Sequence, residues 1–573
     1  MCVFGFYIDG FRLVNYFYGK NMICKHKTKL NKVILVGFLS LLFSVLFFCT
    51  KVNAATDIRV GLKSTYFGKS IITIYNTDIK MGYCINDSFK ADLELKSKGG
   101  FSFEPDKTEY FIDGNVYSKY SAALKKADVY KEAYVCYGGR SKWLVYVKDS
   151  NSDGEINDKD INDTSVEVSG SYTKVNSNDV VSISFGRREI LIDGKVSDGY
   201  PQFMGAGKEK TLSLGSRKYR GRIEIGRYGA DSLNTINIVN IESYLLGVVS
   251  CEMNSTWHSE AQKAQAVAAR SYCLANTGFK ADSYLNKGYV IVDTDESQVY
   301  GGVNKETEIS RYAVQNTLKQ VLRSNGKIVP AYFFSTSGGA TEFSADIWGG
   351  NSSVFIGVFD EYETNPERGP WIVKTTFSEL ESKLQNKGYS VSGIKDVYPE
   401  MLSDSGRVSS VKIKYNGGSL SIKGSVIKSM YGMHSTKFKI ITKGSEDYSV
   451  YVRYVDTEGV SSSETQDNET ERGAGKNAVG NTEAGTSDLY VISGKGQVSK
   501  IADNTDQMVV ISSDNMTNFP ISEPEDNEIW FLGMGWGHGI GMSQSGAYGL
   551  ALKGYNYKDI LKFYYNNTEL DSY

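Results

Sequence analysis

One acidic residue lies between an apolar run and an alanine-rich segment of the sequence. Glu252 follows YLLGVV, and AQKAQAVAAR begins at Ala261. Apolar neighbours raise the pKa of a carboxyl group, because desolvation disfavours the charged form. A carboxyl group that stays protonated near neutral pH can donate a proton in catalysis. The N-terminus of a following helix would lower the same pKa, and Glu252 could instead cap that helix or pair with Arg270.

The segments on either side of Glu252 must position its side chain. YLLGVV is apolar throughout, and we predict a strand there. The alanines recur at helical spacing, which predicts a helix that opens near Ser255 or Thr256 and ends before Gly278. Small side chains give this helix a flat face, so other elements can pack closely against it.

Two glycine-rich segments can bring bare backbone close to a ligand. Gly338 and Gly339 permit a tight turn that exposes its amides. Glycine also occupies every second position from 533 to 541. On an extended chain these glycines share one face, and His538 lies on the other. Either a sugar ring or another strand could approach that bare face.

Four blocks, in this order, resemble the stage II sporulation protein D family, also called SpoIID/LytB. They are EMNSTWHSEAQKAQAVAARSY, SQVYGG, FFSTSGGATEF with Trp348, and GWGHGIGMSQSGAYGLALKGYNYKDILKFYY. The resemblance covers roughly Lys218 to Asn567. It implies a lytic transglycosylase that cleaves peptidoglycan glycan strands, particularly strands stripped of stem peptides by a partner amidase. Other members of the family are described as modifiers that stimulate an amidase.

The resemblance also implies which residues form the site. The catalytic acid of the family falls on Glu252. The implied substrate-binding residues are Lys263, Arg270, Gln298, Tyr300, Ser337, Gly338, Gly339, His538, Ser543 and Gln544. Most glycosidases need two carboxyl groups. A lytic transglycosylase can work with one, because the C6 hydroxyl of muramic acid attacks the anomeric carbon of its own sugar.

We expect no cofactor and no zinc. Some sporulation members of the family bind zinc through a Cys/His cluster just before the Gln-Val-Tyr block. This chain has Val292, Glu296 and Ser297 in that stretch, which are poor substitutes for thiolate and imidazole ligands. Asn254 and His258 stand where the family often has prolines, a difference that affects loop rigidity more than chemistry.

A weak calcium candidate lies at residues 149–160, DSNSDGEINDKD. Its oxygen ligands would be Asp149, Asn151, Asp153 and Asp160, with glycine at the sixth position as in a calcium-binding loop. The last ligand is Asp instead of a bidentate Glu, and no helix pair flanks the loop. A solvated acidic turn is therefore the preferred interpretation.

The N-terminal residues indicate export. A lysine-rich flank precedes an apolar run from Val33 to Cys49, and small residues follow it. This layout predicts a secretory signal, with an uncleaved anchor in the cytoplasmic membrane as the alternative. We then expect the true start at Met22, with residues 1–21 as an artefactual extension. We expect the protein in the cell wall, or on the outer face of the cytoplasmic membrane, of a Gram-positive cell.

Composition argues against other classes of protein. The formal net charge is −2 and no basic stripe is present, so we expect no nucleic-acid partner. The cysteines that follow the signal are too few for a disulfide scaffold; they are Cys84, Cys136, Cys251 and Cys273. A Cys84–Cys136 bridge is one alternative, and buried thiols are the preferred one.

We divide the chain into five segments. Residues 1–55 are the signal or anchor, and residues 56–150 form a strand-rich module with a weak resemblance to a sporulation-related repeat. Residues 180–457 and 489–573 form the SpoIID/LytB-like domain, and the polar residues 458–488 form a disordered insertion. The expected fold class is α+β, with several antiparallel strands around the alanine-rich helix and a groove for a glycan.

The sequence thus predicts an exported peptidoglycan lytic transglycosylase whose partners are glycan strands and a cell-wall amidase. The alternative is a non-catalytic, glycan-binding enhancer of an N-acetylmuramoyl-L-alanine amidase, in which Glu252 need not act. A serine hydrolase that uses Ser335 or Ser337 is disfavoured, because the G-x-S-x-G elbow is absent. Whether the protein serves sporulation or vegetative growth is left open.

Overall fold

The computed structural model describes most of the chain from Asp57 to Tyr573. The described residues are 57–85, 88–148, 173–175, 180–195, 199–208, 210–228, 231–279, 288–349, 352–364, 370–445, 490–492, 498–500, 507–511, 516–520 and 524–573. The predicted signal, the calcium candidate and the predicted insertion lie outside these residues. Within the described ranges, no helix is both long and apolar enough to cross a membrane.

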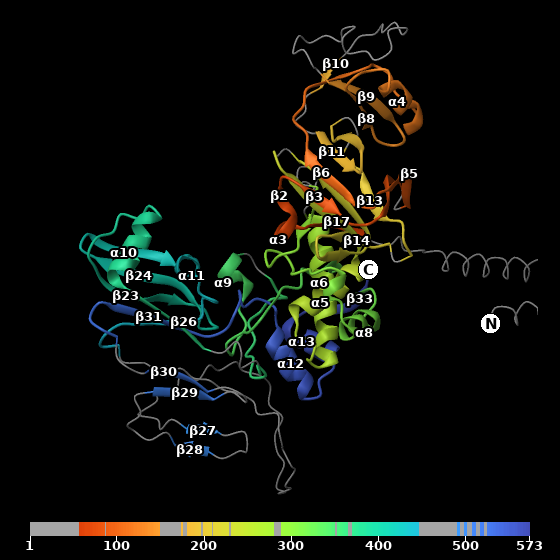
Figure 1. Cartoon of the computed structure of the whole chain (residues 1–573). Coiled ribbons are helices and arrows are strands. Elements are labelled where there is room, and N and C mark those ends of the chain that lie inside the picture. The colour runs from red at the N-terminus through yellow and green to blue at the C-terminus, as the bar shows by residue number, and fades with distance from the viewer. Residues whose placement is uncertain are drawn as a thin grey trace, which may run out of the picture. The chain divides into compact units, whose positions relative to one another are not determined.

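Two sheets contain the strands of the N-terminal half (Figure 1). The first has the order β18-β1-β17-β16-β13-β4-β5, with β2 beside β17. Its strands are β1 (Asp57–Gly61), β2 (Phe67–Lys69), β4 (Asp78–Ile85), β5 (Ser88–Lys96), β13 (Gln202–Gly205), β16 (Arg222–Gly226), β17 (Leu233–Asn240) and β18 (Ile291–Val292). A short helix, α3 (Lys63–Tyr66), connects β1 to β2.

The second sheet has the order β10-β7-β9-β8-β12-β11-β6-β3-β14-β15. Its strands are β3 (Ile72–Ile74), β6 (Phe101–Pro105), β7 (Tyr110–Ile112), β8 (Ala133–Tyr137), β9 (Trp143–Lys148), β10 (Thr173–Val175), β11 (Val180–Phe185), β12 (Arg188–Asp193), β14 (Leu212–Leu214) and β15 (Arg217–Tyr219). Helix α4 (Tyr120–Ala127) contacts β8 and β9. In both sheets, strands from residues 56–150 pair with strands that follow residue 180, such as β1 with β17 and β6 with β11.

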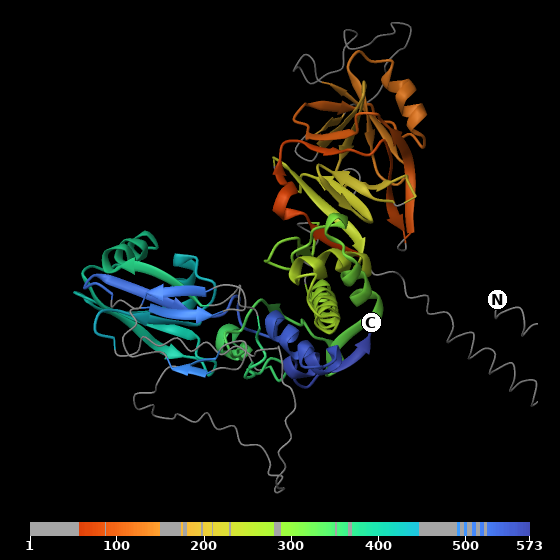
Figure 2. The ribbon, with the colours of Figure 1, turned by 60° about the horizontal axis from the view of Figure 1, so that its bottom comes forward.

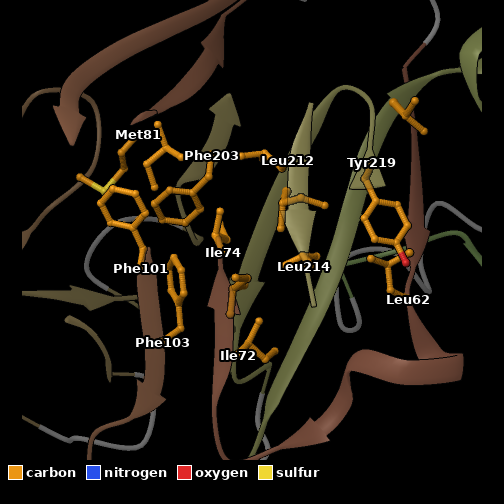
Figure 3. Close-up of a cluster of buried hydrophobic side chains, with 14 of the residues drawn as sticks. Leu62, Ile72, Ile74, Met81, Phe101, Phe103, Phe203, Leu212, Leu214 and Tyr219 are labelled. Atoms are coloured by element: carbon orange, nitrogen blue, oxygen red, sulfur yellow. The ribbon is translucent and has the colours of Figure 1, made fainter. Parts of the chain in front are cut away.

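The core of this half lies between the two sheets. Phe103 of β6 packs against Phe203 of β13, with the ring centroids 5.0 Å apart. Figure 3 shows these rings beside Met81, Ile74 and Leu212, and all five side chains are fully buried. Residues at alternate positions of β6 face this core, which is the pattern of a strand with one buried side.

The cysteines follow the preferred interpretation of buried thiols in two cases. Cys136 and Cys273 are buried thiols, and the thiol of Cys84 donates a hydrogen bond to Gln202 at 3.4 Å. The bridge between Cys84 and Cys136 is therefore not formed.

A group of helices follows β17. They are α5 (Ile241–Glu252), the alanine-rich α6 (Ser259–Phe279), η3 (Val303–Lys305), α8 (Glu308–Asn316), α12 (Gln544–Leu552) and α13 (Tyr557–Tyr564). Helix α6 contacts α5, α8, α12 and α13, and also β19 (Gln320–Ser324), which pairs with β20 (Lys327–Ile328) and β33 (Glu569–Ser572). The mixed α+β class is confirmed, and helices form most of the surroundings of α6.

The run YLLGVV is helical, so the predicted strand is wrong. It belongs to α5, whose N-cap Asn240 accepts a hydrogen bond from the Glu242 amide at 3.0 Å. Tyr244, Leu245 and Val248 are fully buried, because α5 packs against both α6 and α8. An apolar run that is buried on most sides has no period that separates a helix from a strand.

Helix α6 begins and ends later than predicted. It starts at Ser259, and the Asn254 side chain accepts a hydrogen bond from the Thr256 amide in the turn before it. It continues through Gly278 to Phe279. A glycine inside a helix costs about 1 kcal/mol, which the contacts of a long helix can outweigh.

The remaining strands surround a separate buried cluster. One sheet has the order β22-β31-β26, with β22 (Trp371–Thr376), β26 (Phe438–Ile441) and β31 (Glu528–Gly533). The other has β23 (Ile394–Leu402), β24 (Val408–Tyr415) and β25 (Gly418–Lys423), and helices α10 (Phe377–Asn386) and α11 (Gly424–Tyr431) accompany them. In Figure 2, the blue β31 lies among the teal strands of residues far earlier in the chain. Helix α10 has the sequence FSELESKLQN, and β24 has the sequence VSSVKIKY.

Short pairings complete the fold. Two antiparallel pairs are β27 (Tyr490–Ile492) with β28 (Val498–Lys500), and β29 (Gln507–Ile511) with β30 (Met516–Pro520). Strands β21 (Phe333–Phe334) and β32 (Met542–Ser543) form a parallel pair, and the short helix α9 (Ser344–Trp348) follows β21 in the chain. Isolated bridges Thr336–Trp536 and Glu342–Ile540 extend this pairing, so the two glycine-rich segments lie side by side.

Candidate active site around Glu252

Glu252 is the last residue of α5, and its side chain is half-buried. Its Oε1 accepts a hydrogen bond from the Val299 amide at 2.7 Å, and its Oε2 accepts one from the Gln544 side chain at 3.3 Å. Burial raises the pKa of Glu252 to about 7; both hydrogen bonds oppose this rise, and Asp295 adds to it. The negative end of the α5 dipole also favours the protonated form. Such a carboxyl group can both donate and accept a proton near neutral pH.

Two of the predicted substrate-binding residues flank Val299 and are buried. Gln298 forms hydrogen bonds with groups of α5 and α6, and the Tyr300 hydroxyl donates to Asn237 at 3.0 Å. Their exposed fractions are 1% and 3%, whereas that of Val299 is 37%. Anchoring the residues on both sides fixes the Val299 amide where it meets Glu252. Sequence reasoning missed Val299, because a contact through a backbone amide leaves no signal in the side chain.

Gln544 begins α12 and contacts both Glu252 and α6. Its Nε2 lies 3.3 Å from Oε2 of Glu252 and 3.5 Å from Oε1 of Gln265. Ser543 is the N-cap of α12, and its hydroxyl accepts a hydrogen bond from the Gly546 amide at 3.1 Å. Of the predicted substrate-binding residues, Gln544 is therefore brought to Glu252, and Ser543 determines where α12 begins. Gln265 was not predicted.

Arg270 and Lys263 are paired with acidic residues other than Glu252. Nε and Nη2 of Arg270 lie 2.9 and 2.7 Å from the two carboxyl oxygens of Glu242. Nζ of Lys263 lies 2.5 Å from Glu260. The alternative of an ion pair between Arg270 and Glu252 is therefore wrong. Arg270 is 0% exposed, which leaves it no surface for contact with a glycan.

The predicted tight turn at Ser337, Gly338 and Gly339 is confirmed, and it binds a carboxyl group of the same chain. The φ angles of Gly338 and Gly339 are 70° and 100°, a region that favours glycine. The amides of Ser337 and Gly338 donate to Oε1 and Oε2 of Glu363 at 2.5 and 2.8 Å. Glu363 was not predicted, since it lies in a loop with no recognisable motif.

Asp360 lies next to Glu363 and is almost completely buried, with 1% exposed. Its amide donates to the Gly339 carbonyl at 3.0 Å. Hydroxyl groups of Ser337, Ser543 and Tyr564 lie beside its carboxyl group and favour the charged form. Burial raises the pKa of Asp360 to about 6 and that of Glu363 to about 7, and the charge of Asp360 raises the latter further. One proton shared between the two groups relieves their repulsion.

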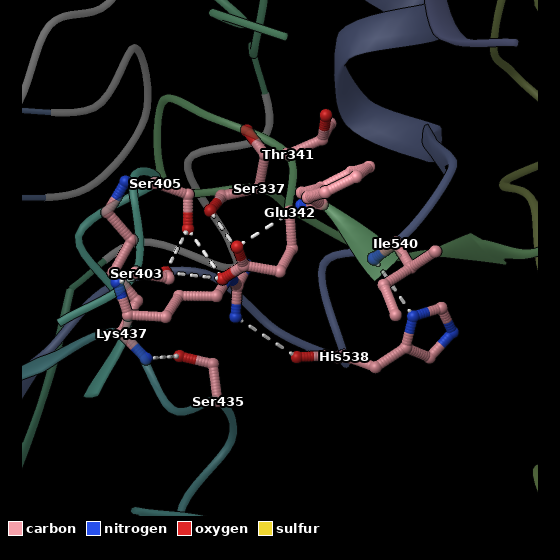
Figure 4. A network of polar contacts seen from close by, with 12 residues as sticks. Ser337, Thr341, Glu342, Ser403, Ser405, Ser435, Lys437, His538 and Ile540 are labelled. Atoms are coloured by element: carbon pink, nitrogen blue, oxygen red, sulfur yellow. Dashed lines mark hydrogen bonds and ion pairs between the residues drawn. The ribbon is translucent and has the colours of Figure 1, made fainter. Parts of the chain in front are cut away.

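Arg407 links this turn to the second glycine-rich segment. Its Nη2 donates to the Ser337 carbonyl at 3.1 Å, and its Nη1 donates to the Gly537 carbonyl at 3.4 Å. Glu342 lies 3.9 Å from Arg407 and accepts hydrogen bonds from Ser403 and Ser405 at 2.7 Å each (Figure 4). The guanidinium is thus a buried connector between two loops.

His538 and Ser337 do not form a nucleophile pair. Nδ1 of His538 accepts a hydrogen bond from the Ile540 amide at 3.0 Å, and burial lowers the pKa of His538 to about 4 (Figure 4). The Ser337 hydroxyl is fully buried and accepts from the Gly339 amide at 3.0 Å. These contacts do not support a serine hydrolase that uses Ser337.

The prediction that the second glycine-rich segment is an extended chain with one bare face is wrong. Its glycines at 535, 537, 539 and 541 have φ angles between 74° and 111°. A Cβ on Gly541 would lie 2.1 Å from the Tyr332 carbonyl oxygen, and one on Gly539 would lie 2.5 Å from Nε of Arg407. The bare backbone therefore packs against protein, which is the second of the two interpretations given above.

The stretch that holds zinc in some sporulation proteins makes other contacts here. The Val292 amide donates to the Ser297 hydroxyl at 3.2 Å, and Glu296 pairs with Lys63 at 2.5 Å. Among the described residues, no three His, Cys, Asp or Glu side chains are grouped so that they could hold a metal ion. That the protein needs no zinc stays a prediction.

Comparison with known proteins finds a family match for part of the chain. Residues 229–323 match the family model SpoIID, stage II sporulation protein. An uncharacterized protein of Brachyspira hyodysenteriae is 26% identical over 364 residues, which are 63% of this chain and 74% of that protein. An amidase enhancer of Bacillus subtilis is 28% identical over 57% of this chain and 40% of its own length. Stage II sporulation protein D of the same organism is 28% identical over 36% of this chain and 61% of its own.

The resemblance inferred from the four sequence blocks is thereby confirmed. The matched family segment contains α5, α6 and Glu252. The chain spans less than two thirds of each of the two Bacillus relatives.

Proposed function

We propose, from the premise that residues 229–323 form a SpoIID-type domain, that this protein is a peptidoglycan lytic transglycosylase with Glu252 as its acid and base. The observation that supports this most is the state of Glu252. Glu252 is a half-buried residue, and its carboxyl group has a pKa of about 7 and is oriented by Val299 and Gln544. The proposed substrate is the glycan strand of peptidoglycan, preferably stripped of stem peptides, outside the cytoplasm.

The reaction needs one carboxyl group in two states. Protonated Glu252 donates its proton to the glycosidic oxygen as the bond between that oxygen and C1 of muramic acid breaks. The Glu252 carboxylate then accepts the proton of the C6 hydroxyl while O6 forms a bond with C1. The products are a 1,6-anhydromuramic end and a free hydroxyl on the leaving sugar, and Glu252 is again protonated. A pKa near 7 suits both steps.

Glu363 is the rival carboxyl group, because burial raises its pKa to about 7 as well. Both of its oxygens, however, are bound by backbone amides of the Ser337–Gly338 turn. Glu252 accepts one hydrogen bond from a backbone amide and one from a side-chain amide, and it lies within the segment that matches the family. We therefore assign the proton transfers to Glu252.

A second candidate function is the stimulation of a cell-wall amidase without cleavage of glycan. One relative, with 28% identity, is named amidase enhancer, which favours this alternative and a cell-wall amidase as partner. In that case the site binds glycan and Glu252 has no chemical role.

The experiment that separates the two functions uses the purified exported chain with no amidase present. Intact and peptide-stripped sacculi are incubated with the protein, and soluble products are identified by mass. Release of 1,6-anhydromuramic products supports the transglycosylase. If no glycan is released, while added amidase is stimulated by the protein, the chain is an enhancer.

A further inference from the structure

The turn at Ser337 and Gly338 holds a carboxylate between two backbone amides. Each amide contacts a different oxygen of Glu363, at 2.5 and 2.8 Å, and the Ser543 hydroxyl donates to Oε1 at 3.4 Å. Successive amides that point into one concavity form an anion-binding nest. Gly338 and Glu363 are partly exposed, although Ser337 is buried. Part of this turn is therefore at the surface of the protein.

Two hydrogen bonds from neighbouring residues link the nest to Glu252. Ser543 contacts Glu363, and the following residue, Gln544, contacts Glu252. Two adjacent residues thus connect the proposed acid with the carboxylate in the nest.

The charged groups around the nest favour the binding of a single carboxylate there. Asp360 is buried beside Glu363 and raises its pKa, whereas Lys437 lowers it. Arg407 binds the carbonyl oxygen of Ser337 from the other side of the turn, at 3.1 Å. A carboxylate from a ligand would meet the same neighbouring charges as the Glu363 carboxylate that it replaces.

We propose that the amides of Ser337 and Gly338 form a binding site for a carboxylate of the substrate, and that Glu363 occupies this site in the free protein. This inference rests on the proposed function, since it concerns the same glycan. Muramic acid carries a lactyl group whose carboxylate is free once the stem peptide has been removed. When the peptide is present, that group is an amide and has no charge.

Exchange of the two carboxylates is feasible near neutral pH. The pKa of Glu363 is raised to about 7, so its charged form is present only in part. A carboxyl group that takes up a proton becomes a weaker acceptor for the two amides. The lactyl carboxylate, with an ordinary carboxylic pKa, stays charged under the same conditions.

The test measures binding of two defined glycans to the exported chain by calorimetry, in the Glu252→Gln background so that the ligands stay intact. One ligand is a peptide-free tetrasaccharide of alternating N-acetylglucosamine and N-acetylmuramic acid. The other is chitotetraose, which has no carboxylate. Glu363→Gln weakens the internal competitor, and Glu361→Gln, on an exposed residue of the same loop, is the matched control.

The muramic tetrasaccharide is expected to bind more tightly than chitotetraose. Glu363→Gln should tighten it further by about tenfold, the gain if Glu363 fills the nest for about 90% of the time. Chitotetraose affinity should not change, and Glu361→Gln should alter neither ligand. Equal affinities for both ligands in the parent, with no selective gain in Glu363→Gln, would overturn the inference and leave the proposed function intact. If neither glycan binds, the proposed function fails, and this inference with it. The comparison of ligands in the parent needs no change at Glu363, so instability of that variant does not prevent the test.

Discussion

Nε2 of Gln544 lies 3.3 Å from Oε2 of Glu252, although 292 positions separate the two residues in the chain. The contact depends on the pairing of β21 with β32, which fixes Ser543, and on the cap that Ser543 forms at the start of α12. The C-terminal block therefore completes the surroundings of a residue that belongs to the family-matched segment. Gln544 also stabilises the ionised form of Glu252, which limits the rise of its pKa.

The rate of glycan cleavage should fall as the pH rises through about 7. Burial raises the pKa of Glu252 to about 7, so the protonated form that starts the reaction predominates below this pH. The fraction of protonated acid falls tenfold for each further pH unit, so kcat/KM at pH 9 should be about a hundredfold below its plateau. The profile of kcat/KM on peptide-stripped glycan between pH 5 and pH 9 measures this.

Glu363 has a similar pKa, so its variant is the control for this profile. Glu363→Gln should keep a midpoint near pH 7, because Glu363 transfers no proton in the proposed reaction. If the pH profile became flat in Glu363→Gln, the titrating group would be Glu363 and not Glu252.

Cleavage should not require a metal ion. The proposed proton transfers use Glu252 and the hydroxyl of the sugar, and Glu296 at the zinc-cluster position is paired with Lys63. Dialysis of the purified protein against a strong chelator should leave the rate of glycan cleavage within about twofold, since no Lewis acid takes part in general acid–base chemistry of this kind. Loss of activity on chelation, with recovery on addition of zinc, would refute this expectation.

Arg270 should matter for stability and not for glycan binding. Arg270→Met leaves Glu242 without its bidentate partner, and breaking a buried pair costs about 3–5 kcal/mol. Arg323, whose partner Asp571 is largely exposed, is the matched control. Arg323→Met should cost less than about 1 kcal/mol. Urea denaturation measures both, and a loss of glycan affinity in Arg270→Met at unchanged stability would restore Arg270 as a ligand of the substrate.

Gly541 should tolerate no side chain. Gly541→Ala places a Cβ where the Tyr332 carbonyl oxygen lies 2.1 Å away, at a φ angle of 81°. Gly554 has a similar φ of 89° but nothing within 4 Å, so Gly554→Ala isolates the cost of the angle. We expect about 1 kcal/mol for Gly554→Ala and about 3 kcal/mol or more for Gly541→Ala, because overpacking adds to the strain. Similar thermal denaturation midpoints for the two variants would mean that the segment can move away from Tyr332.

The sequence predicted several residues of this site, but it did not predict the contacts that they make. Glu252, Gln544 and the turn at Gly338 were all predicted from blocks that resemble the SpoIID family. The amide of Val299 and the carboxyl group of Glu363 were not, because each meets its partner only through the tertiary fold. A backbone amide has no residue type, and one glutamate in a loop resembles any other.

The errors in secondary structure have equally local causes. YLLGVV is apolar on all sides because α5 is enclosed by helices, so its composition suited a strand as well as a helix. The alternating glycines predicted a flat face only if the backbone was extended. Their positive φ angles turn the chain instead, and a period of two then no longer means one face.

Replacement of the proposed acid tests the central claim most directly. Glu252→Gln keeps the shape of the side chain and removes the proton, so release of 1,6-anhydromuramic products should fall at least 10²- to 10⁴-fold, the usual contribution of a general acid or base. Binding of a peptide-free muramic tetrasaccharide, measured by calorimetry on the same preparation, should persist. Glu363→Gln, measured in parallel, should still release these products. Turnover by Glu252→Gln that equals that of the parent would remove Glu252 from catalysis and contradict the account.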